Sequence, residues 1–224
     1  MRILALETST ESGSCALWQE GALLTADCPA GQAHSETLIP LAARLCADAG
    51  CALPEVDAIA FGMGPGAFTG LRVACGIAQG MAVALDVPLV PVGSLEAMAW
   101  AARAERVVSL LDARMGEVYC GAFRREATKL LPVMEPVVAA PALLALPEEG
   151  LWLAVGNALR VYPELAARVQ EFSGWRMDSA VLPHAGSVAE LGALAFARGE
   201  TIAAEEAQPR YVRNKVVLRA AVPG

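Results

Sequence analysis

The chain has 224 residues, of which 55% are hydrophobic and 18% charged, so it can bury a sizeable core and is not disordered. Its net charge of −7 opposes independent binding to a phosphate backbone, so another subunit should hold any nucleic acid. Two apolar stretches, residues 81–92 and 133–147, are interrupted and fall short of the roughly 18 residues of a membrane span. The start has too short an apolar run for a signal peptide, and we expect a cytoplasmic protein.

Six cysteines occur without a CxxC pair: Cys15, Cys28, Cys46, Cys51, Cys75 and Cys120. In a cytosolic chain of this size, such cysteines indicate small buried thiols rather than disulfides.

The first hundred residues predict one α/β unit. An apolar run ends at the acidic Glu7, and a polar turn and a hairpin around Gly21 follow it. The expected elements are a strand (3–6), a hairpin (15–18 and 22–25), a helix (34–49), a strand (56–61), a helix (70–85), a strand (89–92) and a helix (94–104) capped by Ser94.

The same order then returns. Residues 107–111 form an apolar run ending at Asp112, a tight turn follows, and residues 117–123 alternate as a strand. A strand at 153–156 and a helix at 157–169 come next, and a shift of about 105 residues places Glu7 on Asp112. Short apolar runs can match by chance, but a duplicated α/β unit is the better interpretation. We expect lobes at 1–104 and 105–224.

The end of the chain carries a further helix and a basic tail. A capping box formed by Ser187 and Glu190 predicts a helix that ends at Gly199. Whether this helix and the tail pack back on the first lobe stays open. The tail contains Arg210, Arg213, Lys215 and Arg219, which indicate either a solvated terminus or docking on an acidic partner surface.

The loop GMGPGAFTGLR, residues 62–72, joins a strand to a helix, where backbone N–H groups can hold an anion. Gly64 and Gly66 allow close approach of the backbone. The loop is not a GxxxxGK[ST] phosphate loop, because Leu71 and Arg72 follow Gly70. Its spacing alone favours a tight structural turn over an anion site.

Glu7 and Asp112 each end a strand before a polar turn. In two-lobed nucleotide-binding folds such acids face the cleft and hold a metal-bound phosphate, but they can equally cap turns. A nucleotide or anion site would therefore combine the two acids and the glycine loop with the turn residues Thr8 and Ser9.

The helix after the loop has Gly76, Gly80 and Ala84 at four-residue spacing, although glycine inside a helix costs up to about 1 kcal/mol relative to alanine. Such a stripe suits close approach of another backbone, from its own sheet or from another protein. Only His34 and His184 are histidines, and neither an HExxH nor a GxSxG motif is present. We predict no metal site and no serine nucleophile.

Four strings resemble the TsaB (YeaZ) family, a branch of the actin/Hsp70/sugar-kinase superfamily named for tRNA threonylcarbamoyladenosine (t6A) synthesis. They are ILALETST at 3–10, HSETLIP at 34–40, DAIAFGMGPGAFTGLR at 57–72 and DARMGEVY at 112–119. Their order and spacing fit over about residues 1–120. Beyond that the likeness is reduced to Gly156-Asn157, the last helix and the YVR at 211–213.

The resemblance implies two actin-like lobes and a related catalytic partner, TsaD, joined by the ATPase TsaE. That complex transfers threonylcarbamoyl from its adenylate to N6 of adenosine 37 in tRNAs reading codons that begin with A. TsaD binds metal through HxxxH, whereas this chain has His34 followed by Leu38. The resemblance thus implies a non-catalytic subunit, with ATP and metal bound by its partners.

In the family, the two helices of the first lobe form the dimer face, which would serve TsaD or a second copy of the chain. The matching residues here are Leu38, Leu41, Leu45, Val73, Gly76, Ile77, Gly80 and Ala84. One departure concerns Glu7, since family members commonly have Asp there and the longer side chain would intrude into a phosphate site. The alternative function is an actin-like ATPase or sugar-kinase relative that uses Glu7 and Asp112.

Overall fold

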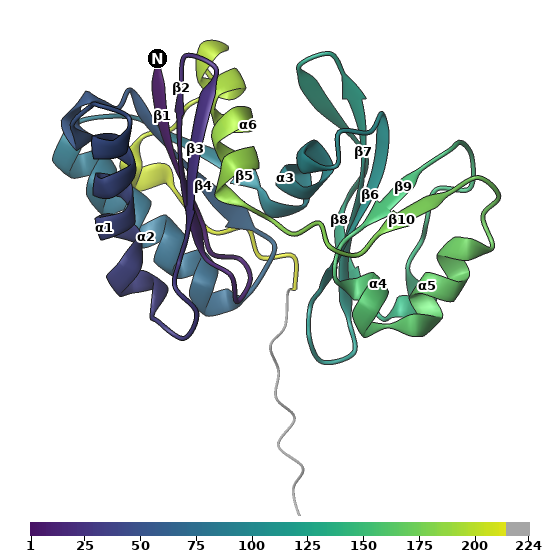
Figure 1. Ribbon diagram of the computed structural model, residues 1–224. Coiled ribbons are helices and arrows are strands. Elements are labelled where there is room, and N and C mark those ends of the chain that lie inside the picture. The colour runs from purple at the N-terminus through teal and green to yellow at the C-terminus, as the bar shows by residue number, and fades with distance from the viewer. Residues whose placement is uncertain (214–224) are drawn as a thin grey trace, which may run out of the picture.

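The computed structural model describes residues 1–213 and consists of two lobes, each built on a five-stranded mixed sheet (Figure 1). The first part of the chain forms β1 (Arg2–Glu7), β2 (Ser14–Gln19), β3 (Ala22–Asp27), α1 (His34–Asp48), η1 (Leu53–Glu55), β4 (Ala58–Gly64), α2 (Phe68–Leu85), β5 (Leu89–Gly93) and α3 (Ser94–Ala101). The second forms β6 (Arg106–Asp112), β7 (Val118–Glu126), β8 (Lys129–Ala139), η2 (Pro141–Leu143), β9 (Leu153–Val155), α4 (Ala158–Val161), α5 (Pro163–Gln170), β10 (Arg176–Asp178), α6 (Ala185–Ala197) and η3 (Ala204–Glu206).

The two sheets share one topology. Their orders are β3-β2-β1-β4-β5 and β8-β7-β6-β9-β10, with an antiparallel meander followed by parallel strands in each. The acids lie at equivalent places, since Glu7 pairs with Ser14 at the end of β1 and Asp112 pairs with Val118 at the end of β6. This repetition confirms the predicted duplication and the two-lobed α/β fold class.

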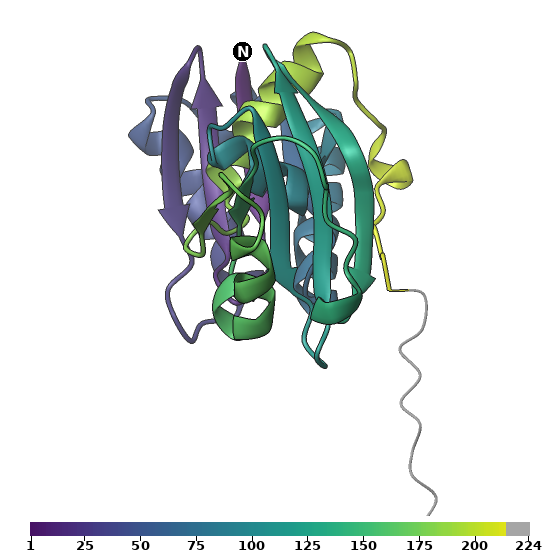
Figure 2. The ribbon, with the colours of Figure 1, turned by 90° about the vertical axis from the view of Figure 1, so that its right-hand side faces the viewer.

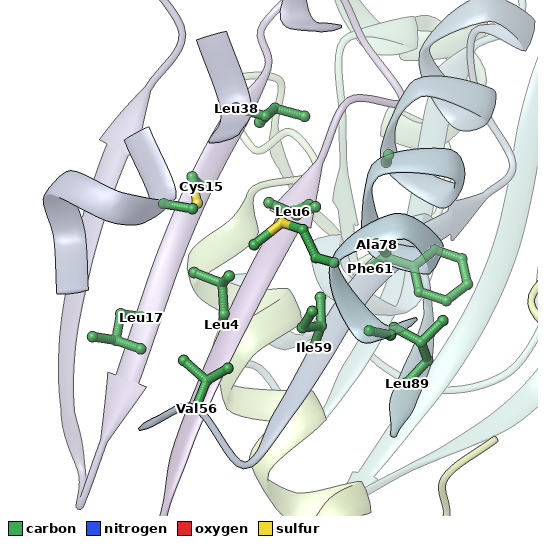
Figure 3. Packing of buried hydrophobic residues seen from close by; sticks show 14 of the residues in the cluster. Leu4, Leu6, Cys15, Leu17, Leu38, Val56, Ile59, Phe61, Ala78 and Leu89 are labelled. Carbon is green, nitrogen blue, oxygen red and sulfur yellow. The ribbon is translucent and has the colours of Figure 1, made fainter. Parts of the chain in front are cut away.

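The outer face of the first sheet is covered by α1 and α2. Leu4 of β1 and Phe61 of β4 are fully buried beneath these helices, together with Leu38 of α1 (Figure 3). Six buried residues of α2 pack inward: Leu71, Ala74, Cys75, Ala78, Met81 and Ala82. The helical spacing predicted both helices correctly, and their buried residues lie on the side that faces the sheet. All six cysteines are free thiols, and only Cys28 is more than marginally exposed.

The inner face of the first sheet is covered by α6, which arrives from the end of the chain. Val188 and Ala189 of α6 pack against Ile3 and Ala5 of β1. The neighbouring α3 packs on β6 and β7 of the second sheet, so α3 and α6 lie between the two sheets (Figure 1). Viewed from the second lobe, its sheet stands in front of α6 and the first sheet (Figure 2).

Three expectations about the second lobe were wrong or incomplete, and proline explains two of them. The helix expected at 157–169 is split into α4 and α5 at Tyr162, whose φ of −122° and ψ of 87° precede Pro163. The strand β8 was not anticipated because it contains Pro132 and Pro136, which are tolerated since β8 is an edge strand. The short exposed edge strand β10 was also missed.

Two predicted helix caps were also wrong. The backbone N–H of Gly93 is bonded by Glu96 (3.3 Å), so α3 is not capped by Ser94, which lies inside its first turn. The last helix begins at Ala185, and its N-cap is His184, whose Nδ1 accepts from the Gly186 N–H at 3.1 Å. The expected capping box fails because Glu190 instead accepts from the indole of Trp100 at 2.6 Å.

The 18-residue helix α2 is long and apolar enough to cross a membrane by length and composition alone. Its buried side, however, packs on β4 within the first-lobe core, which is the position of a core helix. The apolar stretch at 81–92 noted in the sequence covers only the end of this helix.

Two helical glycines should respond in opposite ways to alanine. A Cβ at Gly192 would lie 2.6 Å from the Cβ of Ala60, so Gly192→Ala should destabilise the protein by about 1–3 kcal/mol through overpacking. A Cβ at Gly76 meets nothing, so Gly76→Ala should be neutral or stabilise by up to about 1 kcal/mol. Urea denaturation of both variants checks this, and equal effects would contradict the packing of α6.

Candidate functional site

The glycine-rich loop packs directly against the turn after β1. A Cβ at Gly70 would clash with the Thr8 carbonyl oxygen, and one at Gly66 with Ser9. The Thr8 hydroxyl donates to the Gly70 carbonyl and the Ala67 N–H to the Ser9 carbonyl, each at 2.7 Å. The loop's glycines thus serve contact with the chain itself, as expected of a structural turn.

Gly64, the remaining loop residue proposed for an anion site, has a φ of +109° that side chains rarely adopt. A Cβ there would lie 2.9 Å from the carbonyl oxygen of Arg210, because the tail pairs with the end of β4. This glycine therefore lies against the tail.

Glu7 is buried, with 1% of its surface exposed. Its Oε1 accepts from the Ser9 N–H at 2.5 Å, and its Oε2 accepts from the Ser94 hydroxyl at 3.2 Å. A side chain at Gly62 would occupy the place of this carboxyl group. Burial raises the pKa of Glu7, and the hydrogen bonds from Ser9 and Ser94 partly offset that rise. The longer side chain points into the protein and tethers β1 to α3.

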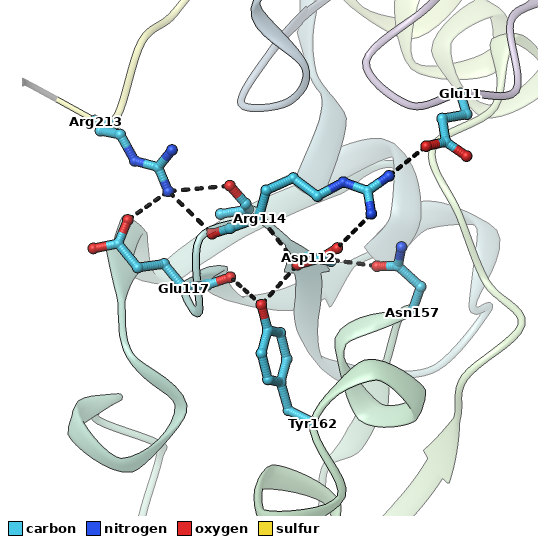
Figure 4. Close-up of polar contacts among 8 residues, drawn as sticks. Glu11, Asp112, Arg114, Glu117, Asn157, Tyr162 and Arg213 are labelled. Atoms are coloured by element: carbon cyan, nitrogen blue, oxygen red, sulfur yellow. Dashed lines mark hydrogen bonds and ion pairs between the residues drawn. The ribbon is translucent and has the colours of Figure 1, made fainter. Parts of the chain in front are cut away.

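Asp112 has both carboxylate oxygens engaged (Figure 4). Its Oδ1 accepts from the Tyr162 hydroxyl at 2.8 Å and from the Arg114 N–H at 2.9 Å, while Oδ2 lies 3.5 Å from Arg114 Nη1. The Asp112 N–H donates to the Asn157 side chain at 2.9 Å. Burial and this hydrogen bond to Asp112 raise the pKa of Tyr162 to about 12. Asp112 anchors the β6–β7 turn to α4 and α5.

The two turns face each other across a cavity of about 250 Å³ between the lobes. Arg114 spans it, because its guanidinium pairs with Asp112 of its own lobe and with Glu11 of the first (Figure 4). Ser9, Gly66 and Asp112 contribute to the wall, whereas Glu7 does not. The sequence analysis placed Glu7 and Asp112 together as site acids, and the structure brings only Asp112 to the cavity.

Further lining residues were not anticipated, among them Asn157 and Arg160. The Gly156-Asn157 pair was noticed as a sequence likeness, but nothing in the spacing indicated that its amide bonds the backbone of Asp112. Tyr162 gave no sequence signal at all, since it contacts Asp112 only through the break between α4 and α5.

The residues proposed for a partner interface separate into three groups. Leu38 and Leu45 are 0% and 5% exposed and belong to the core, so including them was wrong: their side chains support α1 from inside. Leu41, Val73 and Ile77 are half-buried at the border of the core. Gly76, Gly80 and Ala84 lie on the exposed side of α2.

The exposed side of α2, hereafter the α2 outer face, is apolar for its length. Phe68 is 50% exposed at its start, and Val83 is 73% exposed near its end. Between them lie Arg72, Gly76 and Gly80, at four-residue spacing after Phe68 and hence on one side of the helix. Cβ atoms at both glycines would meet open space, unlike those at the loop glycines.

The two arginines in the described part of the tail pair with acids of the second lobe. Arg210 pairs with Glu135 of β8 at 3.0 Å, and Arg213 pairs with Glu117. The expectation of a solvated terminus is therefore wrong for these two arginines. Lys215 and Arg219 lie outside the described residues.

Within residues 1–213 no group of three or more His, Cys, Asp and Glu side chains could hold a metal ion. Leu38, at the place of the second HxxxH histidine, points into the core.

Glu7→Gln tests whether the buried carboxyl is held protonated. In the unfolded chain Glu7 ionises above its ordinary pKa of 4.5, whereas the folded protein keeps the proton to higher pH. The folded state then binds more protons, so the Glu7 contribution to stability is full below pH 4.5 and falls as pH rises. The glutamine variant should gain stability relative to wild type as pH rises from 4.5 to 8 in urea denaturation. A difference that does not vary with pH would contradict this assignment.

Comparison of the sequence and the fold with known proteins shows the family to which the chain belongs. A family model described as "TsaD: tRNA N6-adenosine threonylcarbamoyltransferase" matches residues 29–218. The tRNA threonylcarbamoyladenosine biosynthesis protein TsaB of Escherichia coli is 34% identical, with 98% of this chain and 97% of that protein covered. The Haemophilus influenzae protein of the same name is 37% identical, with 98% and 96% covered. YeaZ from Pseudomonas aeruginosa, a solved structure, is 38% identical with a TM-score of 0.84, covering 94% of this chain and 99% of its own. The chain belongs to the TsaB (YeaZ) family.

Proposed function

We propose that this chain is a non-catalytic scaffold and activating subunit for TsaD in t6A synthesis. The reaction is transfer of a threonylcarbamoyl group to N6 of adenosine 37 of tRNAs reading codons that begin with A. The chain is 34% and 37% identical, over 98% of its length, to two proteins named for t6A biosynthesis, and this supports the pathway. The family model described by the TsaD transferase supports kinship with the catalytic partner.

The α2 outer face is the observation that carries the scaffold role. Helix-interior glycines destabilise an isolated helix, and here neither Gly76 nor Gly80 is needed for contacts within the chain. Together with the exposed Phe68 and Val83, they form a shallow apolar surface on which a partner backbone can approach closely. We place TsaD there, with Leu41, Val73, Ile77 and Ala84 at its border.

The surroundings of Glu7 and Asp112 support a subunit that does not itself catalyse the reaction. A metal-bound phosphate needs carboxylate oxygens that face the ligand. Glu7 is turned into the protein. Oδ1 of Asp112 accepts two hydrogen bonds, and its Oδ2 pairs with the guanidinium of Arg114. These observations do not favour an ATPase or sugar kinase that uses Glu7 and Asp112. In our proposal ATP and metal are bound by TsaD and TsaE, tRNA contacts the chain only through the complex, and the complex works in the cytoplasm.

Bulky substitution on the α2 outer face tests the interface. Gly76→Leu and Gly80→Leu should each abolish co-purification with TsaD, because a leucine fills the space that a partner backbone would occupy. The free variants should stay folded, since a Cβ at either position meets nothing. Ala167→Leu, on the exposed side of α5, is the matched control and should leave TsaD binding intact.

Mass measurement of the free chain accompanies this test, because the same face could serve two copies of the chain. If the free chain is a homodimer and Gly76→Leu converts it to a monomer, the α2 outer face serves self-association as well as TsaD binding. TsaD binding that survives both leucine variants would overturn the proposed interface.

Titration with Mg-ATP separates the scaffold from the alternative enzyme. Isothermal titration of the isolated chain should give no low-micromolar binding, and no ADP should accumulate. Tight binding that is lost in Asp112→Asn, together with turnover, would replace the scaffold proposal with an ATPase.

A further inference from the structure

The tail at residues 210–213 connects the two lobes on the side of the α2 outer face. It runs between them in Figure 1, where it is yellow. The backbone N–H of Arg210 donates to the Met63 carbonyl at the end of β4 (2.7 Å), and its side chain pairs with Glu135 of β8. One residue thus bonds both lobes. Of the residues that follow, Tyr211 contacts the first lobe and Arg213 the second.

At the first lobe, Tyr211 packs on the start of α2. Its ring centroid lies 5.3 Å from that of Phe68, and its hydroxyl accepts from Arg72 Nε at 3.0 Å. The Arg72 guanidinium also lies 3.7 Å from the centre of the Phe68 ring. Since Phe68 and Arg72 begin the α2 outer face, the tail is in contact with the surface that we assign to the partner.

At the second lobe, Arg213 holds the β6–β7 turn. Its Nη2 donates to the carbonyl oxygens of Ala113 (3.0 Å) and Arg114 (3.5 Å) and binds the Glu117 carboxylate (Figure 4). Arg114 and Met115 have φ values of +60° and +56°, a left-handed conformation unfavourable for residues with side chains. The turn has two backbone hydrogen bonds of its own, from the Ala113 N–H to the Glu117 carbonyl and from the Glu117 N–H to the Arg114 carbonyl. Arg213 adds hydrogen bonds from outside the turn, which help to hold this unfavourable conformation.

The space beneath the tail is not filled. A cavity of about 460 Å³ lies between the lobes, lined by Phe68 and Leu71 of α2, by Tyr119 of β7 and by Tyr211 and Val212 of the tail. Close-packed side chains between two lobes resist movement of one lobe against the other, whereas a cavity gives no such resistance. The contacts that the tail makes with each lobe therefore help to fix the separation of the lobes here.

We propose that residues 210–213 act as a strap that couples the α2 outer face to the β6–β7 turn. A partner that moves Phe68 or Arg72 displaces Tyr211, and Arg213 transmits that displacement to the turn. Because Arg114 lies in this turn, the strap also controls the pair formed by Arg114 and Glu11 across the inter-lobe cavity. The partner step rests on the proposed function, but the strap itself can be tested in the free chain.

Hydrogen–deuterium exchange of the full-length chain tests the coupling. Arg213→Ala should speed amide exchange in residues 113–118 by about tenfold, because the turn loses its charged donor. Arg213→Lys should give an intermediate rate, since an ammonium cannot reproduce the guanidinium fork. The decisive variant is Tyr211→Ala, which touches only the first lobe and should also raise exchange in the turn. Arg198→Ala, which breaks an exposed pair with Glu200, is the matched control and should leave it unchanged.

Addition of purified TsaD forms the second arm. Exchange in residues 113–118 should change on TsaD binding in wild type and change less in Tyr211→Ala. Failure of TsaD to bind would remove the proposed function but leave the result in the free chain standing. If Arg213→Ala raises exchange in the turn but Tyr211→Ala does not, Arg213 stabilises the turn only locally. That result would overturn the strap.

Discussion

The first lobe depends on the close contact between the turn after β1 and the glycine-rich loop. Thr8 and Ser9 lie so near to Gly70 and Gly66 that no side chain fits between the two backbones. This contact determines where α2 begins and therefore which of its sides faces the sheet. The same contact turns the Glu7 carboxyl group inward, where Ser9 and Ser94 bond it.

The duplication places two acids at equivalent strand ends, yet their surroundings differ. Glu7 is desolvated and shares a buried hydrogen-bond network, whereas Asp112 borders the inter-lobe cavity and is neutralised by Arg114. Each acid has become an internal anchor for its lobe. In this duplicated framework, the acids at the two equivalent strand ends hold turns in place.

Much of the framework could be predicted from local patterns. Apolar periodicity identified α1, α2 and the strands of both units except β8 and β10, and the repeated acid after an apolar run revealed the duplication. Long-range contacts could not be predicted in this way. The capping motif at Ser187 failed because Glu190 is bonded to Trp100, some ninety residues earlier in the chain. Periodicity also cannot show which leucines of α1 are covered, and Leu38 and Leu45 proved to be core residues.

The position of α6 has a consequence for synthesis of the protein. The inner face of the first sheet, with Ile3, Ala5 and Ala60, is covered by residues 185–197. A ribosome would therefore have made most of the chain before the first lobe could close. Until then an apolar sheet surface would stay open to chaperones or to wrong partners. The first lobe is thus completed by a helix that is synthesised after most of the second lobe. The amino-terminal half should therefore not be expected to fold alone.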